Sequence, residues 1–170
     1  MKVECTIDSK QHILNVNSNK PLNRILFEDI EPALMIDNCD AGNCGNCVVL
    51  LNDKAALACL IPAFKLRGAK VMTFRGYQKS RFWHDVERAY EDTGSNPCPY
   101  CYASKSLIFE SLLQTVAKPG QSESEVEQLS EQTIIDEISL NRCPCLNHDE
   151  IIEIFNQGAM YRRRRRVRRY

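Results

Sequence analysis

The spacing of hydrophobic residues changes near position 80 of this 170-residue chain. Before that point, short stretches alternate apolar and polar positions, and Val3, Cys5 and Ile7 open the first of them. After it, apolar residues recur every three or four positions, which is the period of an amphipathic helix. The pattern predicts an α+β protein in which a small sheet-containing half precedes a helical half.

Four strands and one helix are expected in more detail within the first half. Alternation over residues 3–16, interrupted by a short polar break, predicts a β-hairpin. Residues 18–30 place their apolar side chains on one helical face, with Ser18 or Asn19 as the expected cap. Further strands are predicted over residues 47–53, 54–60 and 69–74, and this half is expected to form a domain over residues 1–76.

The second half, residues 77–158, carries the helical period throughout. Four helices are predicted, over residues 81–90, 104–116, 131–139 and 147–155. Residues 117–128 are polar and contain Pro119-Gly120, which predicts a loop between the second and third of these helices. The last segment, residues 159–170, is rich in arginine and is expected to be a disordered tail.

Composition is that of a globular protein, because 44% of the residues are hydrophobic and 8% are aromatic. No apolar run reaches the roughly 18 residues of a membrane span, and the first residues lack the apolar core of a signal peptide. We therefore expect a soluble, cytoplasmic protein without a membrane span.

The formal net charge of zero is distributed unevenly. Seven of the last ten residues are arginine; subtracting them from the 22 basic residues leaves 15 against 22 acidic ones. Such a charge run is most often a solvated end, although it also suits nucleic acid, anionic lipid or an acidic protein surface. Its tyrosines flank the arginines without alternating with them, so nucleic acid is the less favoured partner.

Cysteine is the residue type that points most directly to chemistry. The chain has nine cysteines, and a cytoplasmic compartment keeps thiols reduced, which favours metal binding over disulfides. Cys5 stands alone on an apolar strand position and is expected to be a buried packing residue. The other eight fall into two sets of four: Cys39, Cys44, Cys47 and Cys59, then Cys98, Cys101, Cys143 and Cys145.

The first set has the spacing Cx4Cx2Cx11C, the plant-type [2Fe–2S] spacing with its fourth thiolate arriving from a following strand. A loop that wraps an inorganic cluster needs small residues that can adopt positive φ and point amides inward. Gly42, Gly45 and Asn43 supply them and are the candidate cofactor-binding residues. Zinc knuckles usually use CxxC pairs, so zinc fits this first spacing poorly.

In the second set, a CxxC pair and a CxC pair each precede a predicted helix. Helix N-termini carry unpaired amides and a partial positive charge, which favour an anionic cluster held by four thiolates. Two helix starts brought together would hold a second [2Fe–2S] cluster between them. Taken alone, the same four cysteines suit a zinc ion equally, and that alternative stays open.

Taken together, the order Cx4Cx2Cx11C, CxxC and CxC over residues 1 to about 158 resembles the small iron–sulfur subunit of molybdenum hydroxylases of the xanthine dehydrogenase, aldehyde oxidase and carbon monoxide dehydrogenase type. The resemblance implies a plant-ferredoxin-like β-grasp domain followed by a four-helix domain. It also implies one [2Fe–2S] cluster in each, the first nearer flavin and the second nearer the molybdenum cofactor. The implied partners are a molybdenum-cofactor large subunit and an FAD subunit.

The second site departs from the family pattern around its ligands. The family motif Q-C-G-(F/Y)-C-T-P-G reads Pro97, Cys98, Pro99, Tyr100, Cys101 here, so a proline replaces the glutamine that contacts the pterin. The later motif C-R-C-T-G-Y has Pro144 in place of its arginine. All eight expected ligands are present, whereas the residues that face the molybdenum cofactor in the family are not.

We therefore expect an electron-transfer protein with two [2Fe–2S] clusters and no catalytic acid or base of its own, acting as a subunit of a molybdenum-hydroxylase-like oxidoreductase. Two alternatives remain at this point. One is a free-standing ferredoxin-like carrier without a molybdenum partner. The other is a non-catalytic module that holds one [2Fe–2S] cluster and one zinc ion.

Overall fold

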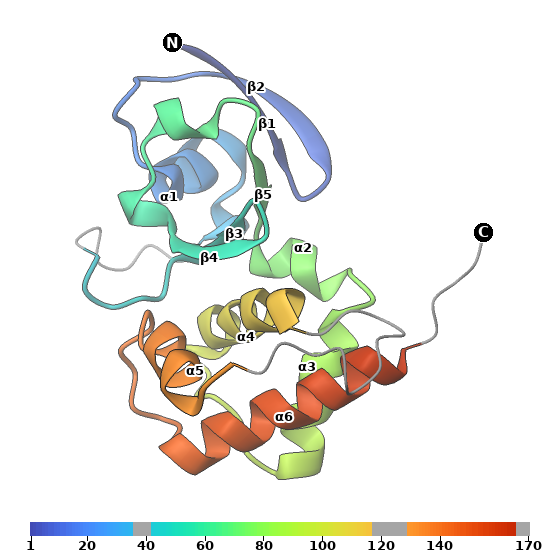
Figure 1. The fold of residues 1–170 in the computed structure, drawn as a ribbon. Helices are drawn as coiled ribbons and strands as arrows, with labels where there is room; N and C mark the ends of the chain where they lie inside the picture. The colour runs from blue at the N-terminus through green and yellow to red at the C-terminus, as the bar shows by residue number, and fades with distance from the viewer. Residues whose placement is uncertain (36–41, 117–128, 166–170) are drawn as a thin grey trace.

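A five-stranded mixed sheet forms one part of the molecule and a group of helices forms the other (Figure 1). The structure is a computed structural model that describes residues 1–35, 42–116 and 129–165. Cys39, the predicted loop over 117–128 and the end of the arginine run lie outside these described residues. In Figure 1, α4 lies between the sheet and the remaining long helices.

The strands follow the order β2-β1-β5-β3-β4 across the sheet. The predicted hairpin is confirmed: its strands pair antiparallel, with Val3 opposite Leu14. The first and last strands pair in parallel at the centre of the sheet, where Thr6 lies opposite Lys70. The strand bounds are β1 Lys2–Ile7, β2 Lys10–Asn15, β3 Val48–Leu51, β4 Lys54–Leu57 and β5 Lys70–Met72. This arrangement, with one helical segment packed on the sheet, agrees with the expected β-grasp fold.

The predicted helix of the first half begins later than expected. It consists of α1 Leu22–Arg24 and a π-helical continuation, Ile25–Ile30. Ser18 and Asn19 do not cap it, because Pro21 occupies the N-cap position and forms a β-bridge with Pro62. The proline ring favours the extended conformation seen there, so the helix starts only after it.

The second half contains the four expected helices and a short additional one. Their bounds are α2 Phe74–Gln78, α3 Trp83–Thr93, α4 Tyr102–Val116, α5 Glu131–Ile138 and α6 His148–Arg164. The last strand was predicted too long, because Thr73 already caps α2 with its side chain. Asp8 fixes this corner by accepting hydrogen bonds from the Thr73 amide at 2.8 Å and the Thr73 hydroxyl at 2.6 Å.

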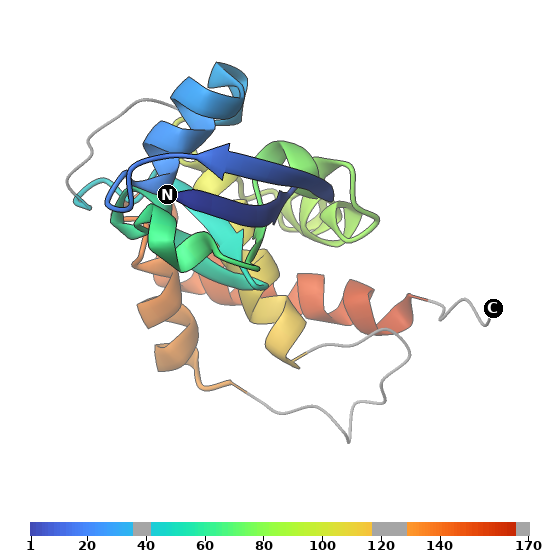
Figure 2. The ribbon, with the colours of Figure 1, turned by 90° about the horizontal axis from the view of Figure 1, so that it is seen from above.

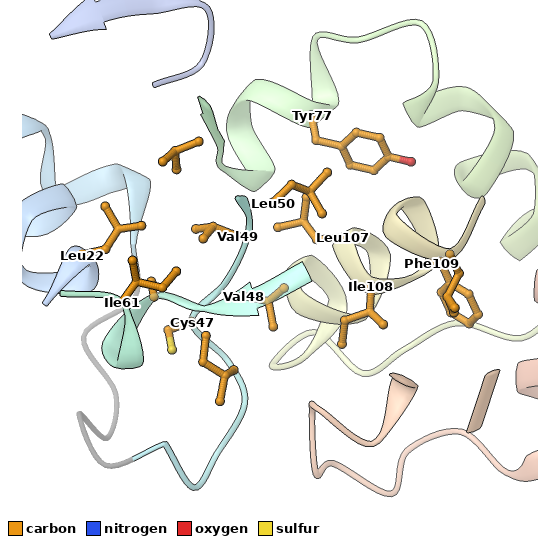
Figure 3. Close-up of a cluster of buried hydrophobic side chains, with 14 of the residues drawn as sticks. Leu22, Cys47, Val48, Val49, Leu50, Ile61, Tyr77, Leu107, Ile108 and Phe109 are labelled. Carbon is orange, nitrogen blue, oxygen red and sulfur yellow. The ribbon is translucent and has the colours of Figure 1, made fainter. Parts of the chain in front are cut away.

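A continuous hydrophobic core joins the two halves. Figure 3 shows Val48 and Leu50 of β3 near Leu107 and Ile108 of α4, with Leu22 on the far side of the sheet. Ser111 of α4 adds a polar link, because its hydroxyl accepts a hydrogen bond from the Ala55 amide at 2.9 Å. The division into domains at residues 76 and 77 stays a prediction, although the core crosses it.

The C-terminal helix extends beyond the expected start of the arginine-rich tail. α6 continues through Arg164, so residues 159–164 are helical rather than disordered. The reason lies in Arg162, which is 1% exposed and forms ion pairs of 2.6 Å with both Asp85 and Glu110. Arg165 also pairs with Asp85. Seen from above, α6 runs beneath the sheet and ends near the C-terminus (Figure 2).

Within the described residues, no helix has the length and apolar character needed to cross a membrane.

Candidate metal centres

The second set of cysteines forms a compact group of thiols. Cys98 and Cys101 lie in the loop that leads into α4, and Cys143 and Cys145 lie in the segment between α5 and α6. All four sulfur atoms lie within 4.8 Å of one another. The Cys98–Cys101, Cys98–Cys143 and Cys101–Cys145 sulfur distances are 3.5, 3.6 and 3.1 Å. The fold thus brings together all four members of this set from two segments distant in sequence.

Backbone amides surround this thiol group. The Cys98 amide donates to the Cys145 sulfur at 3.4 Å. Hydrogen bonds from the Cys101 backbone and side chain, with further ones from Cys143 and Tyr100, lower the pKa of Cys98 to about 7. Burial instead raises the pKa of Cys101, which is fully inaccessible to solvent. The site therefore combines one thiol that ionises readily with one that needs a bound cation to ionise.

Two helices begin next to the group, but only one leaves its N-terminus uncapped. α4 starts directly after Cys101. α6 starts at His148 and is closed by a capping box, in which Asn147 accepts from the Glu150 amide and Glu150 accepts from the Asn147 amide. The expected contribution of helix dipoles is therefore carried mainly by α4.

The first set occupies the loop before β3 and the turn after β4. Cys44 and Cys59 are half-buried and Cys47 is buried, while Cys39 lies outside the described residues. Burial raises the pKa of Cys47 to about 12, and the charges of Cys59 and Cys44 act in the same direction. The three described thiols thus influence one another electrostatically, as expected for neighbours around one site.

Both glycines of this loop adopt positive φ, +69° at Gly42 and +74° at Gly45. A Cβ at Gly45 would lie 2.3 Å from the carbonyl oxygen of Leu140, so no side chain fits there. Asn43 is exposed and does not adopt positive φ. Close approach to the helical half, as well as the turn itself, therefore requires glycine at position 45.

Asn141 joins the two cysteine-bearing segments. Its side-chain amide donates to the Gly45 carbonyl at 3.0 Å and to the Asn46 side-chain oxygen at 2.6 Å. Its own side-chain oxygen accepts from the Cys143 amide at 3.2 Å. The sequence-based prediction missed this residue; its place two positions before Cys143 was the available signal.

The donor atoms fit an iron–sulfur cofactor. Both sites offer cysteine thiols, which are the usual ligands of [2Fe–2S] clusters. Beside the first site, the Asn46 side-chain nitrogen is buried and has no hydrogen-bond partner among the described residues. A donor in that position suits a bound group that brings acceptor sulfurs. The close spacing of the second thiol group also suits a single tetrahedral zinc ion.

Comparison with curated proteins finds iron–sulfur subunits of several oxidoreductases, although no family model matches the chain. One of the nicotinate dehydrogenase subunits of Pseudomonas putida is 29% identical over 126 residues, 74% of each chain. The xanthine dehydrogenase iron–sulfur-binding subunit of Escherichia coli O157:H7 is 26% identical over 151 residues, 88% of this chain and 89% of that one. The aldehyde oxidoreductase iron–sulfur-binding subunit of E. coli K12 is 26% identical over 164 residues, covering 94% and 72%.

Solved structures share the fold. Quinoline 2-oxidoreductase from Pseudomonas putida 86 contains a chain that matches with a TM-score of 0.73 at 22% identity, over 98% of both chains. The aldehyde oxidoreductase from Desulfovibrio desulfuricans matches with the same TM-score at 21% identity, over 94% of this chain and 17% of that one. The β-grasp and helical halves therefore occur together in proteins of this kind.

Proposed function

Because the chain belongs to the family of small iron–sulfur subunits of the molybdenum hydroxylases, we propose that it transfers electrons through two [2Fe–2S] clusters within an oxidoreductase complex. The observation that carries the proposal is the group of four sulfur atoms within 4.8 Å of one another. The plant-type spacing of the first set supports the other cluster. In this proposal the first cluster is held by Cys39, Cys44, Cys47 and Cys59, and the second by Cys98, Cys101, Cys143 and Cys145.

A [2Fe–2S] cluster accepts and releases one electron at a time, so two of them in series link a two-electron oxidation to another acceptor. The chain supplies the framework for this transfer. Asn141 holds the first loop against the segment that carries Cys143, which fixes the separation of the two sites. Gly45 allows the loop backbone to approach that segment closely. The polypeptide orients both sites and contributes no acid or base to the reaction.

The proposed partners are a large subunit with the molybdenum cofactor and an FAD subunit. Support comes from the related iron–sulfur subunits named above. Pro97, Pro99 and Pro144 replace residues that face the molybdenum cofactor in the family, and they favour a second candidate, a free-standing electron carrier. Purification of the natural complex separates the two: a co-purifying large subunit supports the first, and an isolated chain that keeps both clusters supports the second.

Metal analysis of the anaerobically purified chain tests the clusters themselves. About four irons and four sulfides per chain, with two distinct EPR signals after reduction, are expected for two [2Fe–2S] clusters. Cys145→Ser should remove one signal and about half of the iron, whereas Cys5→Ser, on a buried strand position, should keep both. One zinc and about two irons would contradict the second cluster and support the zinc-containing module.

A further inference from the structure

Lys105 lies beside the second thiol group, and its charge has no acidic partner among the described residues. It belongs to the first turn of α4 and is 2% exposed. Its ammonium donates one hydrogen bond, of 3.3 Å, to the carbonyl oxygen of Asn141. No ion pair connects it to a carboxylate within residues 1–35, 42–116 and 129–165. The buried Arg162, in contrast, has two carboxylates within 2.6 Å.

A buried cation without a counter-charge is costly, and folded proteins retain one where an anion compensates it. The surroundings of Lys105 indicate where that anion lies. Its backbone amide donates to the Cys101 carbonyl at 2.9 Å, and its ammonium contacts the residue two positions before Cys143. Lys105 is therefore held against both segments that supply the four thiols.

An open pocket of about 480 Å³ lies at the same place, lined by Lys105, Asn141 and Cys143 among others. Its charged or titratable lining residues besides the cysteine are Lys105, Arg142 and His148, and no aspartate or glutamate lines it. The thiol group is thus the source of negative charge next to the Lys105 ammonium in this part of the described chain.

We propose that Lys105 is the charge partner of the second cluster and favours its reduced form. This inference rests on the proposed function. Two ferric ions, two sulfides and four thiolates sum to a net negative charge, and reduction adds one further electron. A fixed positive charge at this distance stabilises the more negative state, so it raises the reduction potential of the site. Lys105 acts as a positioned charge rather than a ligand.

The experiment compares Lys105→Met, which removes the charge at similar length, with Lys105→Arg, which keeps it. Lys65→Met, at an exposed residue of the sheet half, controls for the change in net charge. Each purified chain is titrated with dithionite in the presence of redox mediators, and both reduced clusters are followed by EPR. The signal of the second site is identified as the one that Cys145→Ser removes.

In Lys105→Met, the ratio of reduced to oxidised second cluster at a fixed solution potential should fall about tenfold, a shift of about 59 mV for one electron. The first cluster should keep its potential, and Lys105→Arg and Lys65→Met should leave both unchanged. An unchanged second potential in Lys105→Met would overturn the inference.

Loss of the second cluster is also informative. If Lys105→Met lacks it while Lys105→Arg retains it at the original potential, the charge is required and the inference stands. If both variants lose it, shape rather than charge is required and the inference is overturned. A parent chain that holds zinc in place of the second cluster refutes the proposed function, and the inference fails with it.

Discussion

The side-chain amide of Asn141 donates a hydrogen bond of 2.6 Å to the side-chain oxygen of Asn46, and both residues are buried. This contact connects the loop of the first cysteine set with the segment of the second across 95 positions of sequence. The two sites are consequently positioned by polar contacts as well as by the shared core.

Asn141→Ala should lower the free energy of unfolding by about 1–3 kcal/mol, because it leaves buried groups of Gly45, Asn46 and Cys143 without their partner. Urea denaturation of the metal-loaded chain, followed by circular dichroism, measures the change. Asn15→Ala, at an exposed position of β2, is the matched control and should change stability little. Equal stabilities of the two variants would contradict the bridging role.

Gly45→Ala should destabilise the chain more than Gly68→Ala, although both glycines have positive φ. At Gly68 nothing lies within 4 Å of the added Cβ, so only the backbone cost of about 1 kcal/mol is expected. At Gly45 the Cβ meets the Leu140 carbonyl and the Asn141 backbone, which adds about 1–3 kcal/mol of overpacking. Thermal unfolding compares the two, and similar losses would argue against the close approach.

Alkylation of the metal-free, reduced chain should label Cys98 before Cys47. The pKa of Cys98 is about 7 and that of Cys47 about 12, so at about pH 8 the first is mostly thiolate and the second mostly thiol. Labelling of Cys98 should slow as the pH falls below about 7, because protonation removes the nucleophile. Iodoacetamide treatment with peptide mass mapping gives the order, and faster labelling of Cys47 would refute it.

Arg162→Met should be among the most damaging substitutions outside the cysteines. It leaves the carboxylates of Asp85 and Glu110 buried without their shared cation, at a cost of about 3–5 kcal/mol. Arg164→Met, at an exposed position of the same helix, is expected to change stability by less than about 0.5 kcal/mol. Denaturant midpoints of the two variants test the contrast, which disappears if the arginine run is only a solvated end.

The sheet and the helices could be predicted from sequence because their apolar spacing depends on local geometry alone. The alternation at Val3, Cys5 and Ile7 places all three in the core, and the cysteine spacing identified the members of the second thiol group. Long-range polar contacts leave no such periodic signal. Nothing in the sequence near Lys105 or Arg162 indicates burial, because each is buried through a partner that is distant along the chain.

The buried arginine of α6 also bears on the order in which the chain is made. Asp85 and Glu110 emerge from the ribosome well before residue 162, and until it follows they are two carboxylates with no shared cation. Cys143 and Cys145 emerge late as well. The sheet half is therefore able to fold during translation, whereas the helical half has to wait for its last helix before it closes and can receive a metal.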